Sequence, residues 1–166
     1  MAENSYKDLL KPIQKGNPAP VYFFHGEESY YIDVLTDAVI NNTLAESERD
    51  FNLNILYGKD GDIDTIKSLV NKYPMIASRQ VVVIKEAQEL KQIESLLNYI
   101  KKPVKSTVLV IGYKHKKMDK RTKFYKTLKD QGSVKLFESK KISERKIPHW
   151  ITEYLSEKGY QSLSNL

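Results

Sequence analysis

The sequence has no cysteine and only three histidines among its 166 residues. Without cysteine, the chain can form no disulfide, no thiolate nucleophile and no cysteine-ligated zinc site. His25, His115 and His149 lie far apart in the sequence, so they do not form the closely spaced groups that are typical of metal ligands. We therefore expect a protein without a metal ion or another cofactor.

Long apolar segments are also missing. No run approaches the roughly 20 apolar residues that a membrane-spanning helix needs. The first residues lack the apolar centre of a signal peptide. These absences predict a protein that does not contact the membrane and works in the cytoplasm.

What the sequence does contain is a regular alternation of apolar runs and helical patterns. Five apolar runs are expected to form strands, and they cover residues 21–24, 53–57, 80–84, 108–111 and 134–137. Helical spacing of apolar residues separates successive runs. Over about 120 residues, this order predicts an α/β fold, with a five-stranded, mostly parallel sheet that has helices on both faces.

Several of the expected helices have recognisable starts. Ser29, Asp62 and Asp119 are the expected N-cap residues of three helices, because their side-chain oxygens can accept a hydrogen bond from an unpaired backbone amide. A further helix is expected over residues 90–100, because apolar residues recur there at helical spacing ahead of Pro103.

The pattern changes after Ser139. The last helical stripe has nothing left to cover, and it contains Trp150, Ile151, Tyr154 and Leu155. We therefore predict an α/β domain over residues 1–140 and the beginning of a second, truncated domain over residues 141–166. On this interpretation the chain is a piece of a longer protein.

The turn after the first expected strand has the position of a phosphate-binding loop but not its residues. Such a loop needs several glycines, a lysine for the phosphates and a Ser or Thr for magnesium. Here the turn is Gly26-Glu27-Glu28-Ser29, with no lysine and with two carboxylates that repel phosphate. After the third strand, Lys85 takes the place of a metal-binding acid. We predict that ATP with magnesium neither binds nor raises the melting temperature.

Apolar residues in a loop before the third strand form a possible binding element. Tyr73-Pro74-Met75-Ile76, here named the apolar loop, follows the end of an expected helix. The side chains of Met75 and Ile76 could fold back over the core, or they could fill pockets on a partner protein. Pro74 restricts Tyr73 to extended geometry and fixes its own φ angle, so the loop would lose less entropy on docking.

Three short motifs, in this order and spacing, resemble the delta subunit family of the bacterial DNA polymerase III clamp loader. They are Gly26-Glu27-Glu28 after the first strand, Ala77-Ser78-Arg79-Gln80 before the third, and Asp119-Lys120-Arg121 before a later helix. The similarity covers residues 18–160. It implies a degenerate AAA+-like (P-loop-like) domain that does not use ATP, followed by the start of a helical lid domain.

The resemblance also implies partners and site residues. In that family, the delta subunit binds the sliding clamp (the beta subunit) and opens the ring, while other subunits hydrolyse ATP. The clamp-binding residues of the family precede the Ala-Ser-Arg-Gln motif, and by position they correspond to Tyr73, Met75 and Ile76. The resemblance therefore implies a DNA replication protein without catalytic residues of its own, whose partners are the clamp, other clamp loader subunits and primed DNA.

Positive charge is concentrated in one region. The net charge is +6, and residues 114–146 contain thirteen Lys or Arg against four acids, so that the rest of the chain is acidic. Lys116, Lys117, Lys120 and Arg121 crowd around the expected start of one helix, where the helix dipole disfavours cations. The crowding predicts an anionic partner, either DNA phosphate or a neighbouring subunit, and the alternative is a solvated surface.

Two other functions stay open from the residues alone. The basic region would suit a free-standing nucleic-acid-binding domain, and a DNA titration at several salt concentrations would reveal one by its steep salt dependence. A divergent P-loop ATPase is less favoured, because the chain lacks the lysine and the acid pair that neutralise phosphate and bind magnesium.

Overall fold

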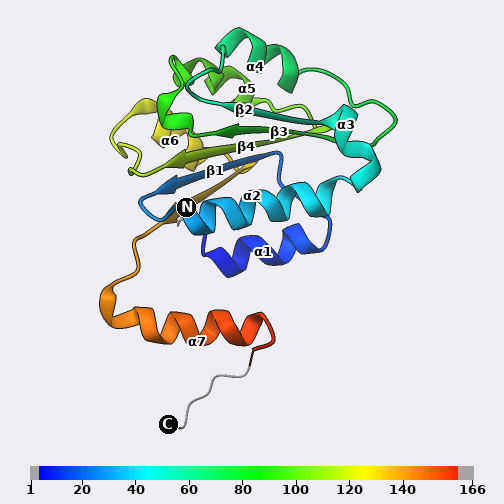
Figure 1. The fold of residues 1–166 in the computed structure, drawn as a ribbon. Helices are drawn as coiled ribbons and strands as arrows, with labels where there is room; N and C mark the ends of the chain where they lie inside the picture. Colours follow the sequence, from blue (N-terminus) through cyan, green and yellow to red (C-terminus); the bar gives the residue numbers. More distant parts are fainter. Residues whose placement is uncertain (1–3, 161–166) are drawn as a thin grey trace.

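The computed structural model describes residues 4–160, which form a parallel sheet with helices on both faces (Figure 1). The strands are β1 (Val21–Gly26), β2 (Leu53–Tyr57), β3 (Gln80–Lys85), β4 (Thr107–Lys114) and β5 (Val134–Ser139). Every pairing in the sheet is parallel, and the strand order is β2-β3-β4-β1-β5. The prediction of a five-stranded sheet with helices on both faces is confirmed.

Different helices cover the two faces. On one face lie α1 (Tyr6–Gln14) and α2 (Ser29–Thr43), and on the other lie α4 (Ile63–Val70), α5 (Leu97–Lys101) and α6 (Lys123–Asp130). Because successive strand residues point to opposite faces, Phe24 packs with the first group and Phe23 with the second. A strand covered on both sides needs apolar residues at every position, which explains the continuous apolar run at the start of β1.

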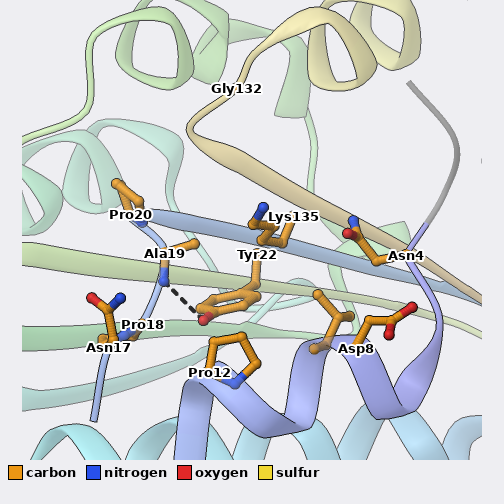
Figure 2. A pocket seen from close by; sticks show the side chains of 11 residues that line it. Asn4, Asp8, Pro12, Asn17, Pro18, Ala19, Pro20, Tyr22, Gly132 and Lys135 are labelled. Atoms are coloured by element: carbon orange, nitrogen blue, oxygen red, sulfur yellow. Dashed lines mark hydrogen bonds between the residues drawn. The ribbon is translucent and has the colours of Figure 1, made fainter. Parts of the chain in front are cut away.

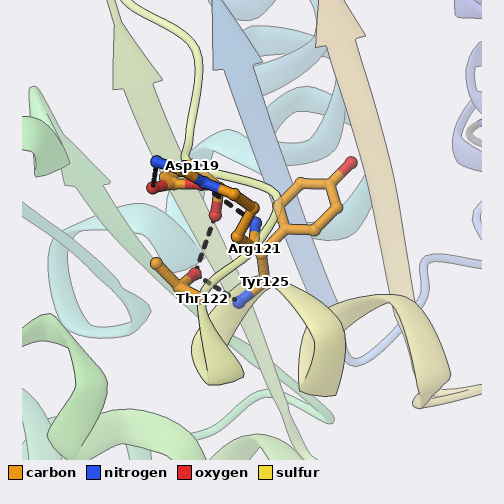
Figure 3. A network of polar contacts seen from close by, with 4 residues as sticks. All are labelled: Asp119, Arg121, Thr122 and Tyr125. Carbon is orange, nitrogen blue, oxygen red and sulfur yellow. Dashed lines mark hydrogen bonds and ion pairs between the residues drawn. The ribbon is translucent and has the colours of Figure 1, made fainter.

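The predicted N-cap residues of α4 and α6, two helices on the same face of the sheet, have different outcomes. Asp62 caps α4 as predicted, and its carboxylate accepts a hydrogen bond from the Thr65 amide at 2.8 Å. The prediction that Asp119 caps α6 is wrong. Thr122 caps that helix instead, with its hydroxyl accepting a hydrogen bond from the Tyr125 amide at 3.2 Å (Figure 3). Both residues are good caps, and the backbone becomes helical only after Thr122.

The continuous helix predicted over residues 90–100 is also wrong. The structure has a 3₁₀ turn at Ala87–Glu89, a second one at Ile93–Leu96, and only then α5. Gln92 has a φ of 60°, a left-handed conformation that ends any right-handed helix. The apolar residues still reach the core, because short 3₁₀ turns preserve nearly the same spacing.

The last helix, α7 (Ile147–Glu157), contacts the start of α2 through aromatic side chains. Trp150 donates a hydrogen bond from its indole nitrogen to the Tyr31 hydroxyl. The Tyr30 ring lies 5.7 Å from the Trp150 ring and 6.0 Å from the Tyr154 ring, measured between centroids. The expectation that this stripe covers nothing is therefore wrong for its aromatic part. The division into two domains stays a prediction.

Between α2 and β2 the chain forms a 3₁₀ turn (Glu46–Glu48) and the short helix α3 (Arg49–Asn52). A similar 3₁₀ turn (Glu144–Lys146) precedes α7. Over residues 4–160, every helix is too short or too polar to cross a lipid bilayer.

Candidate protein-binding loop at the amino ends of the strands

The apolar loop lies between α4 and β3, at the amino-terminal end of the sheet and next to α3 (Figure 1). Its side chains are largely exposed to solvent, with exposed fractions of 80% for Tyr73, 47% for Met75 and 97% for Ile76. The alternative that Met75 and Ile76 fold back over the core is therefore wrong for Ile76. Met75 is half-exposed.

The backbone of the apolar loop is attached to Asn52, the last residue of α3. The Asn52 amide oxygen accepts a hydrogen bond from the Met75 nitrogen at 2.7 Å, and its amide nitrogen donates to the Met75 carbonyl at 2.8 Å. Next to this pair, Ile76 has a φ of 55°. A β-branched residue rarely adopts this left-handed conformation, which persists only where the surrounding structure enforces it.

The base of the loop is held by a second amide. Gln80 is the first residue of β3, and its buried side chain donates hydrogen bonds to the Leu69 carbonyl and the Thr107 hydroxyl, both at 2.9 Å. These contacts join the end of α4, the start of β3 and the start of β4. The last residue of the Ala-Ser-Arg-Gln motif therefore has a structural role directly below the loop.

Sequence analysis missed two residues next to the loop. Phe51 in α3 is exposed, and it adds an aromatic side chain beside the residue that holds Met75. A single Phe before an expected strand is indistinguishable from a core residue in the sequence. Asn52 contacts a residue 23 positions away, so no local pattern predicts its role.

At the opposite end of the sheet, the turn after β1 closes on the chain itself. Gly26 has a φ of 134°, and a Cβ atom at this position would lie 2.1 Å from the Ser139 carbonyl oxygen. The predicted cap Ser29 is wrong, because Glu28 caps α2 and accepts a hydrogen bond from the Tyr30 amide at 3.1 Å. An amide that would face phosphate in a nucleotide-binding loop thus faces a carboxylate of the chain.

The predicted cationic site lies close to this turn. Glu138 near the end of β5 is buried, and its carboxylate contacts the Lys120 ammonium at 2.6 Å and the Lys117 ammonium at 3.8 Å. Lys116 forms an isolated bridge with Gly26, and its ammonium lies 5.8 Å from the centre of the Tyr113 ring. The cations therefore lie in the segment before α6 rather than in its first turn.

Arg121 has an acidic partner within the same segment (Figure 3). Its guanidinium donates two hydrogen bonds to the Asp119 carboxylate at 3.0 Å, and its backbone amide donates a third at 2.9 Å. These hydrogen bonds lower the pKa of Asp119 to about 2. Of the four predicted cations, Lys117, Lys120 and Arg121 are thus paired with acids of this chain.

An open pocket of about 410 Å³ lies beside α1 (Figure 2). Tyr22 lies at its floor, and its hydroxyl accepts a hydrogen bond from the Ala19 amide at 2.8 Å. Pro12, Pro18 and Pro20 form part of the wall. None of the site residues predicted from the sequence lines this pocket. Its lining includes Pro20 and Gly132, which lie just before β1 and β5.

Comparison with protein families matches residues 22–139 to the model described as "DNA polymerase III, delta subunit". The chain belongs to this family. It is also 26% identical over 132 residues to DNA polymerase III subunit delta of Bacillus subtilis (strain 168), an alignment that covers 74% of this chain and 38% of the relative. The family expected from the three motifs is confirmed.

Two solved structures have the same overall fold as this chain. A DNA clamp loader delta protein of Bacillus subtilis matches 93% of this chain with a TM-score of 0.78 and 21% identity. A DNA polymerase III gamma subunit-related protein of Thermotoga maritima matches 93% with a TM-score of 0.54 and 16% identity. This delta-family chain spans about half the length of both structures.

Family membership leaves the residue assignments as predictions. The matched region contains the apolar loop and the four cations before α6. The roles of Tyr73, Met75 and Ile76 in clamp binding, and of the cations in DNA or subunit contact, are not tested by these similarities.

Proposed function

We propose that this chain binds a sliding clamp through the apolar loop and takes part in opening the clamp ring, as the delta subunit of a clamp loader. The observation that carries the proposal is the exposure of Tyr73, Met75 and Ile76 together on one loop of fixed backbone. Single exposed apolar residues are ordinary, but a group of them marks a surface for a partner. Met and aromatic side chains are well suited to fill pockets on another protein.

The rigidity of the loop supports the same proposal. Pro74 fixes one φ angle, Asn52 holds the Met75 backbone, and Gln80 holds the base of the loop. A loop that is already ordered loses less conformational entropy when it docks, so more of the contact energy remains as affinity.

The turn after β1 supports a role without ATP hydrolysis. The Glu28 carboxylate accepts a hydrogen bond from the Tyr30 amide in the first turn of α2, and Gly26 packs against the backbone of Ser139. β3 ends in Lys85, where a hydrolase needs an acid for magnesium. We therefore propose that the chain itself is not catalytic and that other subunits supply the hydrolysis.

In the whole protein, the proposed partners are the sliding clamp, the other clamp loader subunits and primed DNA, all in the cytoplasm. A contact of Lys116, Lys117, Lys120 and Arg121 with DNA or a neighbouring subunit stays part of this proposal. A free-standing nucleic-acid-binding function is not favoured, because three of these cations already have acidic partners within the chain.

The proposal predicts a large loss of clamp affinity when Met75 and Ile76 are both changed to Ala. Burying one such side chain in a partner pocket is worth about 1.5–3 kcal/mol. At about 1.4 kcal/mol per decade, the double change should weaken binding roughly a hundredfold or more. Surface-binding measurements with a purified sliding clamp give the affinity, and thermal unfolding gives the stability. The melting temperature should stay within a few degrees.

Ile151→Ala is the matched control, because Ile151 in α7 is exposed to nearly the same degree as Met75 but lies outside the loop. It should leave clamp affinity unchanged. Unchanged affinity of the Met75→Ala, Ile76→Ala variant would remove the loop from the interface. A large fall in its melting temperature would instead show that these side chains belong to the core.

A further inference from the structure

We propose that Asn52 is the positioning residue of the clamp-binding surface. It holds the apolar loop in the conformation that the clamp recognises, without contacting the clamp itself. This inference rests on the proposed function of the loop. It concerns a residue that belongs neither to the loop nor to the family motif beside it.

The contact geometry singles out this side chain. Asn52 is 1% exposed, so its amide is removed from competing water. Its oxygen accepts from the Met75 nitrogen and its nitrogen donates to the Met75 carbonyl, so both polar groups of one loop residue are satisfied by one side chain. The same nitrogen donates to the Glu48 carbonyl at 3.0 Å, which anchors the amide to the turn before it.

The conformation of Ile76 explains why the loop needs such an anchor. Its φ of 55° is unfavourable for a β-branched residue, and its side chain is 97% exposed, so the side chain gains little from packing. Fixing the Met75 peptide groups restricts the backbone that leads into Ile76. Without this restraint, Ile76 is free to return to an extended conformation, and its side chain then points in another direction.

Only an amide can make both contacts at once. Asn has an acceptor and a donor on the same planar group, whereas Asp is ionised and accepts only. Asn52→Asp keeps the contact to the Met75 nitrogen but places a carboxylate oxygen against the carbonyls of Met75 and Glu48. Asn52→Ala removes the side-chain hydrogen bonds to Met75 and Glu48. The two variants therefore disturb the loop in different ways and have different risks for folding.

The first measurement is clamp affinity of Asn52→Ala and Asn52→Asp in this chain, by surface binding to a purified sliding clamp below the melting temperature of each variant. Both should bind about tenfold more weakly or worse, equivalent to about 1.4 kcal/mol. The control is Asn42→Ala, because the Asn42 amide donates to the Ala38 carbonyl within its own helix, α2, at 2.8 Å. This control should bind as the unchanged chain does.

Two further measurements distinguish a positioning role of Asn52 from a general loss of stability. Ile76→Ala should cost much less affinity in the Asn52→Ala background than in the unchanged chain, because the misplaced side chain has already lost its pocket. Hydrogen exchange at the Met75 amide should become faster in both Asn52 variants, while exchange within β1 and β4 stays unchanged. Additive effects of the two changes, or unchanged exchange at Met75, would overturn the proposal.

The results separate this inference from the proposed function. If changing Met75 and Ile76 to Ala abolishes binding while both Asn52 variants bind normally, the loop is the clamp site and the role of Asn52 is refuted. If the loop variant binds normally, the proposed function fails and the positioning role fails with it. Weak binding by the loop variant and by both Asn52 variants, with non-additive coupling, supports both.

Discussion

The two ends of the sheet carry loops of opposite character. At the carboxyl end, β1 ends in Gly26, which has a positive φ and packs against the backbone of β5. At the amino end, the apolar loop contains Ile76 at a positive φ, with its side chain in solvent. Glycine at such an angle allows close packing at little cost. Isoleucine at such an angle is strained, and strain that the fold enforces at an exposed site is a sign of function.

The same two ends of the sheet differ in how much apolar surface they expose. In open α/β folds, ligands ordinarily bind beyond the carboxyl ends of the strands. Here that end is filled by contacts within the chain, among them Glu28 with the Tyr30 amide and Lys120 with Glu138. The exposed apolar group lies at the other end of the strands. The exposed apolar surface therefore lies at the end of the sheet opposite to the one where such folds ordinarily bind ligands.

The largest effect on this comparison is expected from Gly26→Ala. The added Cβ would lie 2.1 Å from the Ser139 carbonyl oxygen, so β1 and β5 must separate, and the φ of 134° is unfavourable for alanine. We expect a loss of roughly 3 kcal/mol in the free energy of unfolding. Denaturant titration measures it, and Gly132→Ala, with open space around the position, serves as the control. A loss of similar size in both variants would refute this account of the turn.

A smaller difference in stability is expected between two variants at Ile76, Ile76→Gly and Ile76→Ala. Glycine relieves the left-handed strain, which costs roughly 1–2 kcal/mol for other residues, but it adds entropy to the unfolded chain. We therefore expect Ile76→Gly to be more stable than Ile76→Ala by about 1 kcal/mol, although both lose clamp affinity. Parallel denaturant and surface-binding measurements test this. An alanine variant that is as stable as the glycine variant would show that the backbone at Ile76 is not strained.

The smallest effect is expected from Asp119→Asn at the carboxyl end. The hydrogen bonds from Arg121 lower the pKa of Asp119 to about 2 in the folded chain, below the ordinary value of 3.8. A lowered pKa stabilises the fold at pH values above the ordinary pKa, and this contribution is lost as the pH falls through the folded pKa. The small stability difference between the two chains at neutral pH should therefore shrink between pH 4 and about pH 2. Acid titrations of thermal stability measure it, and a difference that persists at pH 2 would contradict the assignment.

The errors of the sequence analysis have a common physical cause. Glu28 caps α2 in place of the neighbouring Ser29, and Thr122 caps α6 in place of Asp119. Each pair offers two suitable oxygens within one turn, and the position at which the backbone becomes helical decides between them. The broken helix around Gln92 has the same origin, because helical spacing of apolar residues does not reveal one left-handed residue.

The sequence by itself determined the strands, the missing phosphate-binding residues, the family and the position of the apolar loop. These features depend on local composition and spacing, such as a continuous apolar run for a doubly covered strand. Only the tertiary structure decided the strand order, the exposure of Ile76, the ion pair of Lys120 with Glu138 and the hydrogen bonds of Asn52 with the Met75 backbone. The physical reason is that each of these depends on segments distant in the sequence, which meet only when the helices pack on the sheet.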